Sequence, residues 1–191
     1  MKGLRKIDGG IKMYISEIRT KAPMDVPRTP LETKMYKMLD KLGILYEHVD
    51  NDPAHTMEEC SEIDKVIGTE IRKNVFLCNQ KKTSFFLLVM PANKPFDTAA
   101  FSKKLGVSHM SFAPEEKMIE HLGTTSGSAS VAGILNDEDD WVQVIIDKEV
   151  ADAEWFGCNP GINTSHLKFK TQDLLKKFLA KNHHRARIVD L

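Results

Sequence analysis

Residues 73–90 read KNVFLCNQKKTSFFLLVM, and this stretch decides the fold class. Two apolar runs, residues 74–78 and 84–90, are separated by the polar turn NQKK at residues 79–82. Such a pattern is typical of a β-hairpin, because both runs favour strands and the polar turn interrupts them. The sequence therefore predicts at least one antiparallel pair of strands in the middle of the chain.

Helical segments lie on both sides of this hairpin. Residues 31–42 carry apolar side chains on one stripe, and Gly43 follows as a stop signal. Thr56 and Glu59 have capping-box spacing and begin a second helix, which Gly68 ends. Further helices are expected over residues 97–105 with Asp97 as the cap, over residues 114–122, and after Thr171 as the cap of the last helix. Further strands are expected over residues 44–49, 107–112, 141–147 and 165–169. This mixture predicts a single α/β domain with a mixed sheet.

Composition argues against several classes of protein. Twenty-seven basic and 27 acidic residues cancel over 191 residues, so the overall charge favours neither nucleic acid nor a membrane surface. The three cysteines are far apart and outside any CxxC pattern, which predicts neither a disulfide framework nor a zinc site. No apolar run reaches transmembrane length, and the first residues lack a signal-peptide core. We expect a cytoplasmic protein with no membrane contact, no metal and no other cofactor.

Both ends of the chain are expected to lie outside the domain. Residues 1–30 begin with basic side chains and end with three prolines, which predicts an extended N-terminal extension. Residues 183–191 are predicted to be a C-terminal tail, and His183 and His184 are interpreted as solvated rather than metal-binding. The domain itself is then expected to span residues 31–182.

A glycine-rich loop is the main candidate for a binding site. Residues 123–137 read GTTSGSASVAGILND, and their small side chains leave backbone N–H groups free to bind developing negative charge. On composition alone, a flexible connector explains the loop as well. Thr125 stands where a nucleophile elbow would have serine, and a helix rather than a strand precedes it, so a serine hydrolase is not predicted.

Four short motifs occur in an order that resembles one known family. They are HTMEE at residues 55–59, EIRKNVFL at 70–77, GSASV with GILND at 127–137, and NPGINT at 159–164. Together they resemble the YbaK and prolyl-tRNA-synthetase-associated editing domain family, and most of all its freestanding prolyl-tRNA editing proteins. The resemblance covers residues 31–180 and implies an α/β domain with a mixed, partly barrel-like sheet flanked by helices.

The function implied by this resemblance is hydrolysis, in trans, of the aminoacyl ester of mischarged tRNA(Pro). Alanine is the expected amino acid, and cysteine, removed by another branch of the family, is the alternative. Prolyl-tRNA synthetase would be a transient partner. A module that binds a free amino acid or charged tRNA without hydrolysing it is the alternative from a different functional class.

The resemblance also implies roles for individual residues. It places the functional lysine at Lys73, where a cation could bind the terminal phosphate or the oxyanion, with Gly157 and Asn163 as further catalytic candidates. The substrate-binding candidates are His55, Gly127, Ser128, Ala129, Ser130, Val131, Asn159, Pro160 and Thr164. Many relatives have histidine where Asn159 stands, so this position departs from the family pattern. Without the resemblance, Lys73 is interpreted as an ordinary surface lysine at the start of a strand.

The amino-acid pocket is expected to be small and apolar. Its expected walls are Gly127, Ala129, Val131 and Ile134, with Phe76 and Met90 as possible contributors. A pocket of this kind favours alanine, because a second site that admits only the smaller product corrects an error of the synthetase. Cys158 is interpreted as part of the wall rather than a nucleophile, since no base is fixed beside it in the sequence.

A basic segment near the C-terminus is the candidate RNA-binding surface. Residues 168–187 contain seven Lys or Arg residues and one acid, Asp173. We assign the RNA contact to Lys176, Lys177 and Lys181, because contacts to phosphate need such a local patch in a neutral protein. A solvated amphipathic helix is the alternative interpretation, and the basic N-terminal arm is the second candidate surface.

Overall fold

The computed structural model describes residues 4–6, 12–21, 26–54 and 56–191. Its helices are α1 (Pro30–Lys41), α2 (Met57–Ile67), α3 (Thr98–Leu105), α4 (Glu115–Leu122), the 3-10 helix η1 (Val131–Asn136), α5 (Lys148–Asp152), and a continuous C-terminal helix formed by α6 (Thr171–Asp173), the π-helical turn η2 (Leu174–Phe178) and α7 (Leu179–Lys181). Its strands are β1 (Leu4–Lys6), β2 (Lys12–Tyr14), β3 (Tyr46–Asp50), β4 (Lys73–Asn79), β5 (Phe85–Met90), β6 (Met110–Phe112), β7 (Val142–Asp147), β8 (Trp155–Cys158), β9 (Ser165–Lys170) and β10 (Arg187–Val189).

The hairpin β4–β5 lies at the centre of a five-stranded sheet with the order β10-β7-β5-β4-β6. Strand β5 pairs antiparallel with β4 and parallel with β7, so the sheet is mixed. Every residue of β5 is buried, and alternate side chains enter two different apolar clusters, Leu87 on one side and Leu88 on the other. The α/β class with a mixed sheet is therefore confirmed.

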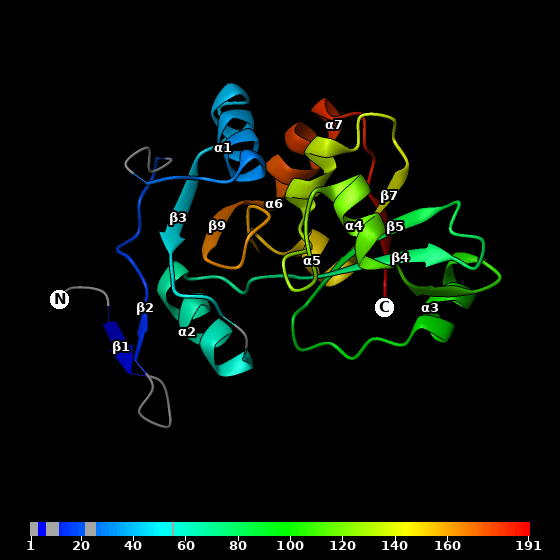
Figure 1. Cartoon of the computed structure of the whole chain (residues 1–191), viewed down its shortest axis with the longest axis horizontal. Helices are drawn as coiled ribbons and strands as arrows, with labels where there is room; N and C mark the ends of the chain where they lie inside the picture. Colours follow the sequence, from blue (N-terminus) through cyan, green and yellow to red (C-terminus); the bar gives the residue numbers. More distant parts are fainter. Residues whose placement is uncertain (1–3, 7–11, 22–25, 55) are drawn as a thin grey trace.

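Helices cover the two faces of this sheet unequally (Figure 1). The larger cluster takes side chains from α1, α4, η1 and the C-terminal helix, among them Met35, Leu122 and Phe178. The smaller cluster on the other face is closed by α3, which contributes Phe101 and Leu105. Because both faces are covered, the central strands are continuously apolar rather than alternating, and the sequence of β5 reflects this.

A second sheet has three antiparallel strands in the order β3-β9-β8. It meets the larger sheet just before β4, where Ile71 bridges to Gly157 and Arg72 N donates to Gly157 O at 2.9 Å. The described strands remain in separate sheets and do not close into the barrel-like shape that the family resemblance implied. Within the described residues, no helix combines the length and apolarity needed to cross a bilayer.

Local sequence signals placed the helix ends well. Helix α2 has the expected capping box between Thr56 and Glu59 and ends at Gly68 with a φ of 71°. The Asp97 side chain caps α3, as expected. Thr171 is instead the first residue of the C-terminal helix, whose start has no side-chain cap. The short elements α5, β8 and β10 were not predicted, because three to five residues show too little periodicity.

The described parts of both chain ends contact the domain. Met13 and Ile15 pack with Ile63 and Ile67 of α2, and Ile15 bridges to Asn51 beside β3. At the other end, β10 lies within the stretch predicted to be a tail and pairs parallel with β7 as an edge strand of the large sheet. Both segments therefore extend existing sheets and cores.

An ion pair joins the segment before α1 to strand β3. Arg28 donates two hydrogen bonds to Asp50, at 2.6 and 2.8 Å, and a third to Glu32 at 3.1 Å. Burial alone would raise the pKa of Asp50, but the neighbouring His48 and Arg28 outweigh it and hold that pKa well below its usual range. Folding therefore favours the charged form of this carboxyl group.

We expect Asp50→Asn to lower the free energy of unfolding at pH 7 by about 2–3 kcal/mol, since it removes the carboxylate that accepts two of the three hydrogen bonds of Arg28 and leaves only Glu32 as its anionic partner. The folded pKa of Asp50 lies below the unfolded value of about 4, so its contribution is full above that pH and is lost as pH falls through the folded pKa. Urea unfolding at pH 7, 4 and 3 measures the difference between wild type and variant. A difference that stays constant across this range would contradict the assignment.

Candidate active site

A cavity of about 610 Å³ opens between α2 and the start of β4. Several parts of the chain that are far apart in sequence form its walls. Helix α2 contributes Glu58, Cys60, Ser61, Glu62, Asp64 and Lys65; the start of β4 and the residues before it contribute Ile71, Arg72, Lys73 and Asn74; other segments contribute Ala54, Ala92, Asn93, Gly127, Ala129, Asn159, Asn163 and His166. The cavity is therefore assembled by the tertiary fold and not by one local motif.

Five of the residues assigned from the sequence meet at this cavity. They are Lys73, Gly127, Ala129, Asn159 and Asn163. The glycine-rich loop and the loop after β8 thus lie on the same cavity as the first residue of β4. The convergence of these separate motifs makes the cavity the candidate active site.

The Lys73 ammonium group has no carboxylate partner among the described residues. Its Nζ donates to Lys94 O at 3.3 Å, and no described carboxylate lies within salt-bridge distance of it. The other cations of the cavity differ, because Lys65 pairs with Glu62 and Arg72 pairs with Glu70. Lys73 can therefore offer its charge to a phosphate or to a developing oxyanion.

Hydrogen bonds lock the two loops of the cavity together. Ser130 Oγ donates to Asn159 O and accepts from Ala132 N at 3.1 Å. Asn159 Nδ2 donates to Ala129 O at 3.4 Å, and its Oδ1 accepts from Gly161 N at 2.8 Å. Ser130 and Asn159 thus shape the loops, and Ser130 does so without reaching the cavity wall.

Two backbone donors of the glycine-rich loop lie on the cavity wall without an acceptor among the described residues. Ser128 and Gly133 donate their N–H groups within the loop, to Thr125 O and Ser130 O at 3.0 Å each. By contrast, the N–H groups of Gly127 and Ala129 have no hydrogen-bond acceptor among the described residues. Both residues line the cavity, so these donors can bind a ligand oxygen.

The cavity differs from the small apolar pocket that the sequence predicted, because most of its lining residues are polar and most of the expected apolar walls lie elsewhere. Val131, Ile134, Phe76 and Met90 are between 0 and 4% exposed and belong to the cores behind the loop. The cavity instead has three carboxylates of α2 on its wall, Glu58, Glu62 and Asp64. Ser128, Pro160 and Thr164 do not line the cavity either, and His55 lies outside the described residues.

Gly157 has a structural position rather than a place on the cavity. A Cβ atom at this residue would lie 2.5 Å from Glu70 O and 3.0 Å from Thr69 Cγ2. The absence of a side chain lets β8 approach the segment before β4, where Gly157 O accepts from Arg72 N. Gly157 does not line the cavity, and its close packing favours a structural role over the catalytic role expected from the sequence.

Cys158 lies beside Gly157 and is also absent from the cavity wall. It is fully buried in the larger core, and burial raises the pKa of its thiol. A thiolate is therefore disfavoured at this position, and no described residue activates it as a nucleophile. The expectation that it forms part of the wall is corrected to a core residue.

Comparison with known proteins identifies the family. The family described as "Aminoacyl-tRNA editing domain" matches residues 51–177. This chain belongs to that family. The prolyl-tRNA editing protein ProX of Acetoanaerobium sticklandii is 31% identical over 153 residues, 80% of this chain and 93% of the relative. Prolyl-tRNA synthetase associated domain-containing protein 1 of Danio rerio is 24% identical over 165 residues, 85% of this chain and 86% of the relative.

Solved structures support the same fold. One is described as a candidate trans-editing enzyme for prolyl-tRNA synthetase and superposes with a TM-score of 0.62 at 15% identity, covering 86% of this chain and 98% of that one. The hypothetical protein APE2540 superposes with a TM-score of 0.59 at 16% identity over 75% of this chain and 92% of that one. The family resemblance of the four sequence motifs is thus confirmed.

Asp64 and His166 are among the cavity residues of this editing domain that the sequence interpretation did not assign. Asp64 accepts from Ile71 N at 2.8 Å, and burial raises its pKa to about 6. His166 is 5% exposed, and burial, helped by His48, lowers its pKa to about 4. The alternation of β9 is the signal that could have found His166, because a period of two places it on the face opposite to Leu167.

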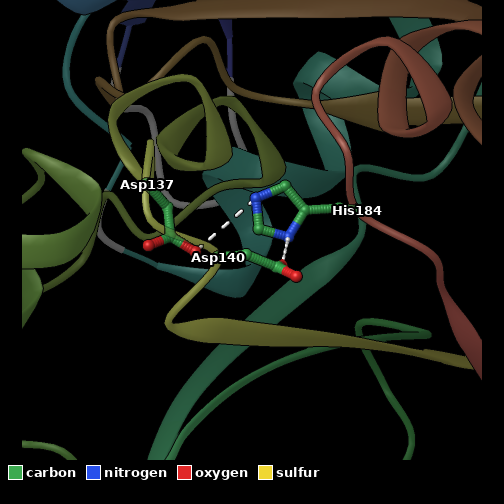
Figure 2. A group of neighbouring side chains, drawn as sticks. All are labelled: Asp137, Asp140 and His184. Atoms are coloured by element: carbon green, nitrogen blue, oxygen red, sulfur yellow. Dashed lines mark ion pairs between the residues drawn. The ribbon is translucent and has the colours of Figure 1, made fainter.

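A second titratable cluster lies away from the cavity. His184 lies between two carboxylates, with Nε2 3.5 Å from Asp137 Oδ2 and Nδ1 3.0 Å from Asp140 Oδ1 (Figure 2). These three side chains form the one group among the described residues with metal-ligand spacing. Asp137 also accepts from Trp141 N and Val142 N, so the cluster ties the C-terminal segment to the start of β7. The interpretation of His184 as solvated is wrong, since it is 2% exposed.

We expect Gly157→Ala to lower the free energy of unfolding by about 1–3 kcal/mol, because the added methyl group forces Glu70 away from β8. Gly106→Ala is the comparison variant without a steric contact, since its Cβ would meet nothing within 4 Å and only the backbone strain at its φ of 73°, about 1–2 kcal/mol, acts there. Thermal and urea unfolding of both variants measure the effect. Unchanged stability with loss of activity in Gly157→Ala would restore the catalytic assignment.

Proposed function

We propose that this editing domain is an aminoacyl-tRNA deacylase that acts in trans on mischarged tRNA(Pro). The observation that carries the proposal is the position of the Lys73 ammonium, which no described carboxylate neutralises, on the same cavity as the N–H groups of Gly127 and Ala129, which have no acceptor among the described residues. The name of the relative from Acetoanaerobium sticklandii, a prolyl-tRNA editing protein, supports the choice of substrate.

The proposed reaction is the hydrolysis of an activated ester. Water adds to the ester carbonyl carbon, the carbon–oxygen bond to the ribose breaks, and the ribose oxygen takes a proton, which leaves free amino acid and tRNA. Such a substrate needs positioning more than a strong nucleophile. In this mechanism Lys73 binds the terminal phosphate or the oxyanion, and the loop N–H groups hold the carbonyl oxygen. The neighbouring ribose hydroxyl assists the proton transfer.

Alanine is the proposed amino acid, and cysteine is the alternative within the same reaction. Gly127 and Ala129 occupy little of the cavity, and Asn163 offers a polar side chain on its wall. Deacylation of a panel of tRNA(Pro) species charged with alanine, cysteine, serine and proline decides between these substrates. Prolyl-tRNA synthetase is proposed as a transient partner that supplies the mischarged product.

We expect Lys73→Ala to lower kcat/KM for deacylation by about 30- to 1,000-fold, which corresponds to about 2–4 kcal/mol of transition-state stabilisation. The reason is the loss of the one cavity ammonium that no described carboxylate neutralises. Lys81→Ala is the matched control, because Lys81 is exposed in the turn between β4 and β5. Release of free amino acid from charged tRNA is the measurement. A Lys73→Ala variant with more than a third of wild-type activity would contradict the role.

The surface proposed for tRNA is the exposed side of the C-terminal helix. Lys176, Lys177 and Lys181 are exposed there, and Lys177 is partly neutralised by Asp173 at 2.7 Å. Figure 1 places α7 at the top of the molecule and α2, which lines the cavity, at the bottom. Contacts there would hold a part of the tRNA distant from the ester.

We expect reversal of Lys176, Lys177 and Lys181 to Glu to weaken tRNA binding and to reduce its salt dependence, because phosphate contacts release counterions. Hydrolysis of a minimal aminoacyl-adenosine ester should stay near the wild-type rate, since these side chains lie outside the cavity. Filter binding at several salt concentrations, together with ester hydrolysis, tests both statements. If the affinity and salt slope do not change, the N-terminal basic arm becomes the candidate surface.

A further inference from the structure

His166 is a buried imidazole on the wall of the cavity, and the proposed reaction gives it no role. It comes from β9, where its ring is held by Asn51 through a contact of 2.8 Å between Nδ1 and Asn51 Oδ1. Asn51 Nδ2 in turn donates to Asp52 O at 2.8 Å and to Asn163 O at 3.0 Å. The ring is therefore part of a chain of hydrogen bonds that ends at the loop after β8.

This chain of hydrogen bonds determines where the proton of the ring is. Because Asn51 Nδ2 uses its hydrogens on two carbonyl oxygens, Oδ1 is the atom that faces His166 and can only accept. His166 Nδ1 must then carry the hydrogen, which leaves Nε2 with a lone pair. Burial lowers the pKa of the ring to about 4, so the ring stays neutral and Nε2 remains an acceptor.

The lone pair of Nε2 is available to a ligand. Among the described residues no donor is bonded to Nε2. The atom is also not one of the fully enclosed polar atoms without a partner, so it remains accessible. Since His166 lines the cavity, the open side of the ring faces that space. The same cavity carries the carboxylates of Glu58 and Asp64, which favour a positively charged group, and that of Glu62, which already pairs with Lys65.

We propose that His166 Nε2 accepts a hydrogen bond from the α-amino group of the bound aminoacyl ester, with Asp64 on α2 balancing the charge of that group. This inference rests on the proposed deacylase function and adds to it the recognition of the amine. The substrate offers three donors in the cavity, which are the amine, the neighbouring ribose hydroxyl and the attacking water. A base that activates water works best with a pKa near neutrality, and the pKa of the His166 ring lies well below that. A neutral acceptor beside an acidic wall is better suited to the positively charged amine.

The test compares His166→Asn with wild type on two esters of adenosine, alanyl and propionyl, which differ only in the α-amino group. Asparagine is chosen because its amide can replace Nδ1 as the donor to Asn51, while Nε2 is removed. We expect kcat/KM for the alanyl ester to fall about 10- to 100-fold and that for the propionyl ester to stay within about 2-fold of wild type. His166→Gln, whose amide reaches further, should restore part of the alanyl activity.

Each outcome decides a separate question. Equal loss on both esters would overturn the amine contact and would assign His166 to water positioning or to structure, while deacylation itself stands. If wild-type protein releases no amino acid from any ester or charged tRNA, the proposed function fails and this inference fails with it. Loss confined to the alanyl ester, with an unchanged melting temperature, supports the proposal.

A measurement on the wild-type protein covers the case in which the variants do not fold. The imidazole nitrogens are labelled with 15N, and the non-hydrolysable alanyl amide of 3′-amino-3′-deoxyadenosine is added to saturation. We expect the Nε2 resonance of His166 to shift with this compound and not with its propionyl counterpart. Identical spectra with both compounds would overturn the amine contact.

Discussion

The backbone contact between Arg72 and Gly157 determines where the cavity forms. Arg72 N donates to Gly157 O at 2.9 Å, and this approach is possible because Gly157 has no Cβ atom that would meet Glu70 O. The contact joins the start of β4 to β8, and β8 pairs with β9. Lys73 at the start of β4 and His166 on β9 therefore reach one cavity, although the two residues belong to different sheets.

Charges of both signs in this cavity match the chemistry of an aminoacyl ester. The protein as a whole is neutral, so attraction of such a ligand must come from local groups. Lys73 supplies a positive charge from β4, and Glu58, Glu62 and Asp64 supply negative charge from α2. The aminoacylated end of a tRNA carries a negative phosphate on the terminal adenosine and a positive ammonium group on the amino acid. A cavity with a cation on one wall and carboxylates on another can orient such a ligand in a single direction.

The sequence predicts the elements that are determined by neighbouring residues, and it does not predict the contacts that are determined by residues far apart in the chain. The capping box of Thr56 and Glu59 and the hairpin β4–β5 are local, and both are confirmed. The family resemblance selected Lys73 and Asn163, and the structure places both on one cavity. His166 could not be assigned in this way, because its hydrogen-bond partner Asn51 lies 115 residues away. Likewise, strand β10 could not be predicted from the sequence, because three residues are too few to show a hydrophobic alternation. It is identified by its pairing with β7 in the structure.

The departure at Asn159 from the family pattern has a structural counterpart. Where many relatives have histidine, Asn159 here binds Ala129 O and Gly161 N, so its side chain is occupied in joining the two loops. The described imidazole of the cavity comes instead from β9, as His166. A ring on a paired strand, held by Asn51, is fixed more closely than one on a loop, because fewer backbone torsions remain free. In this protein the two tasks are therefore separate, since Asn159 holds the loops together while His166 presents its ring to the cavity from the strand.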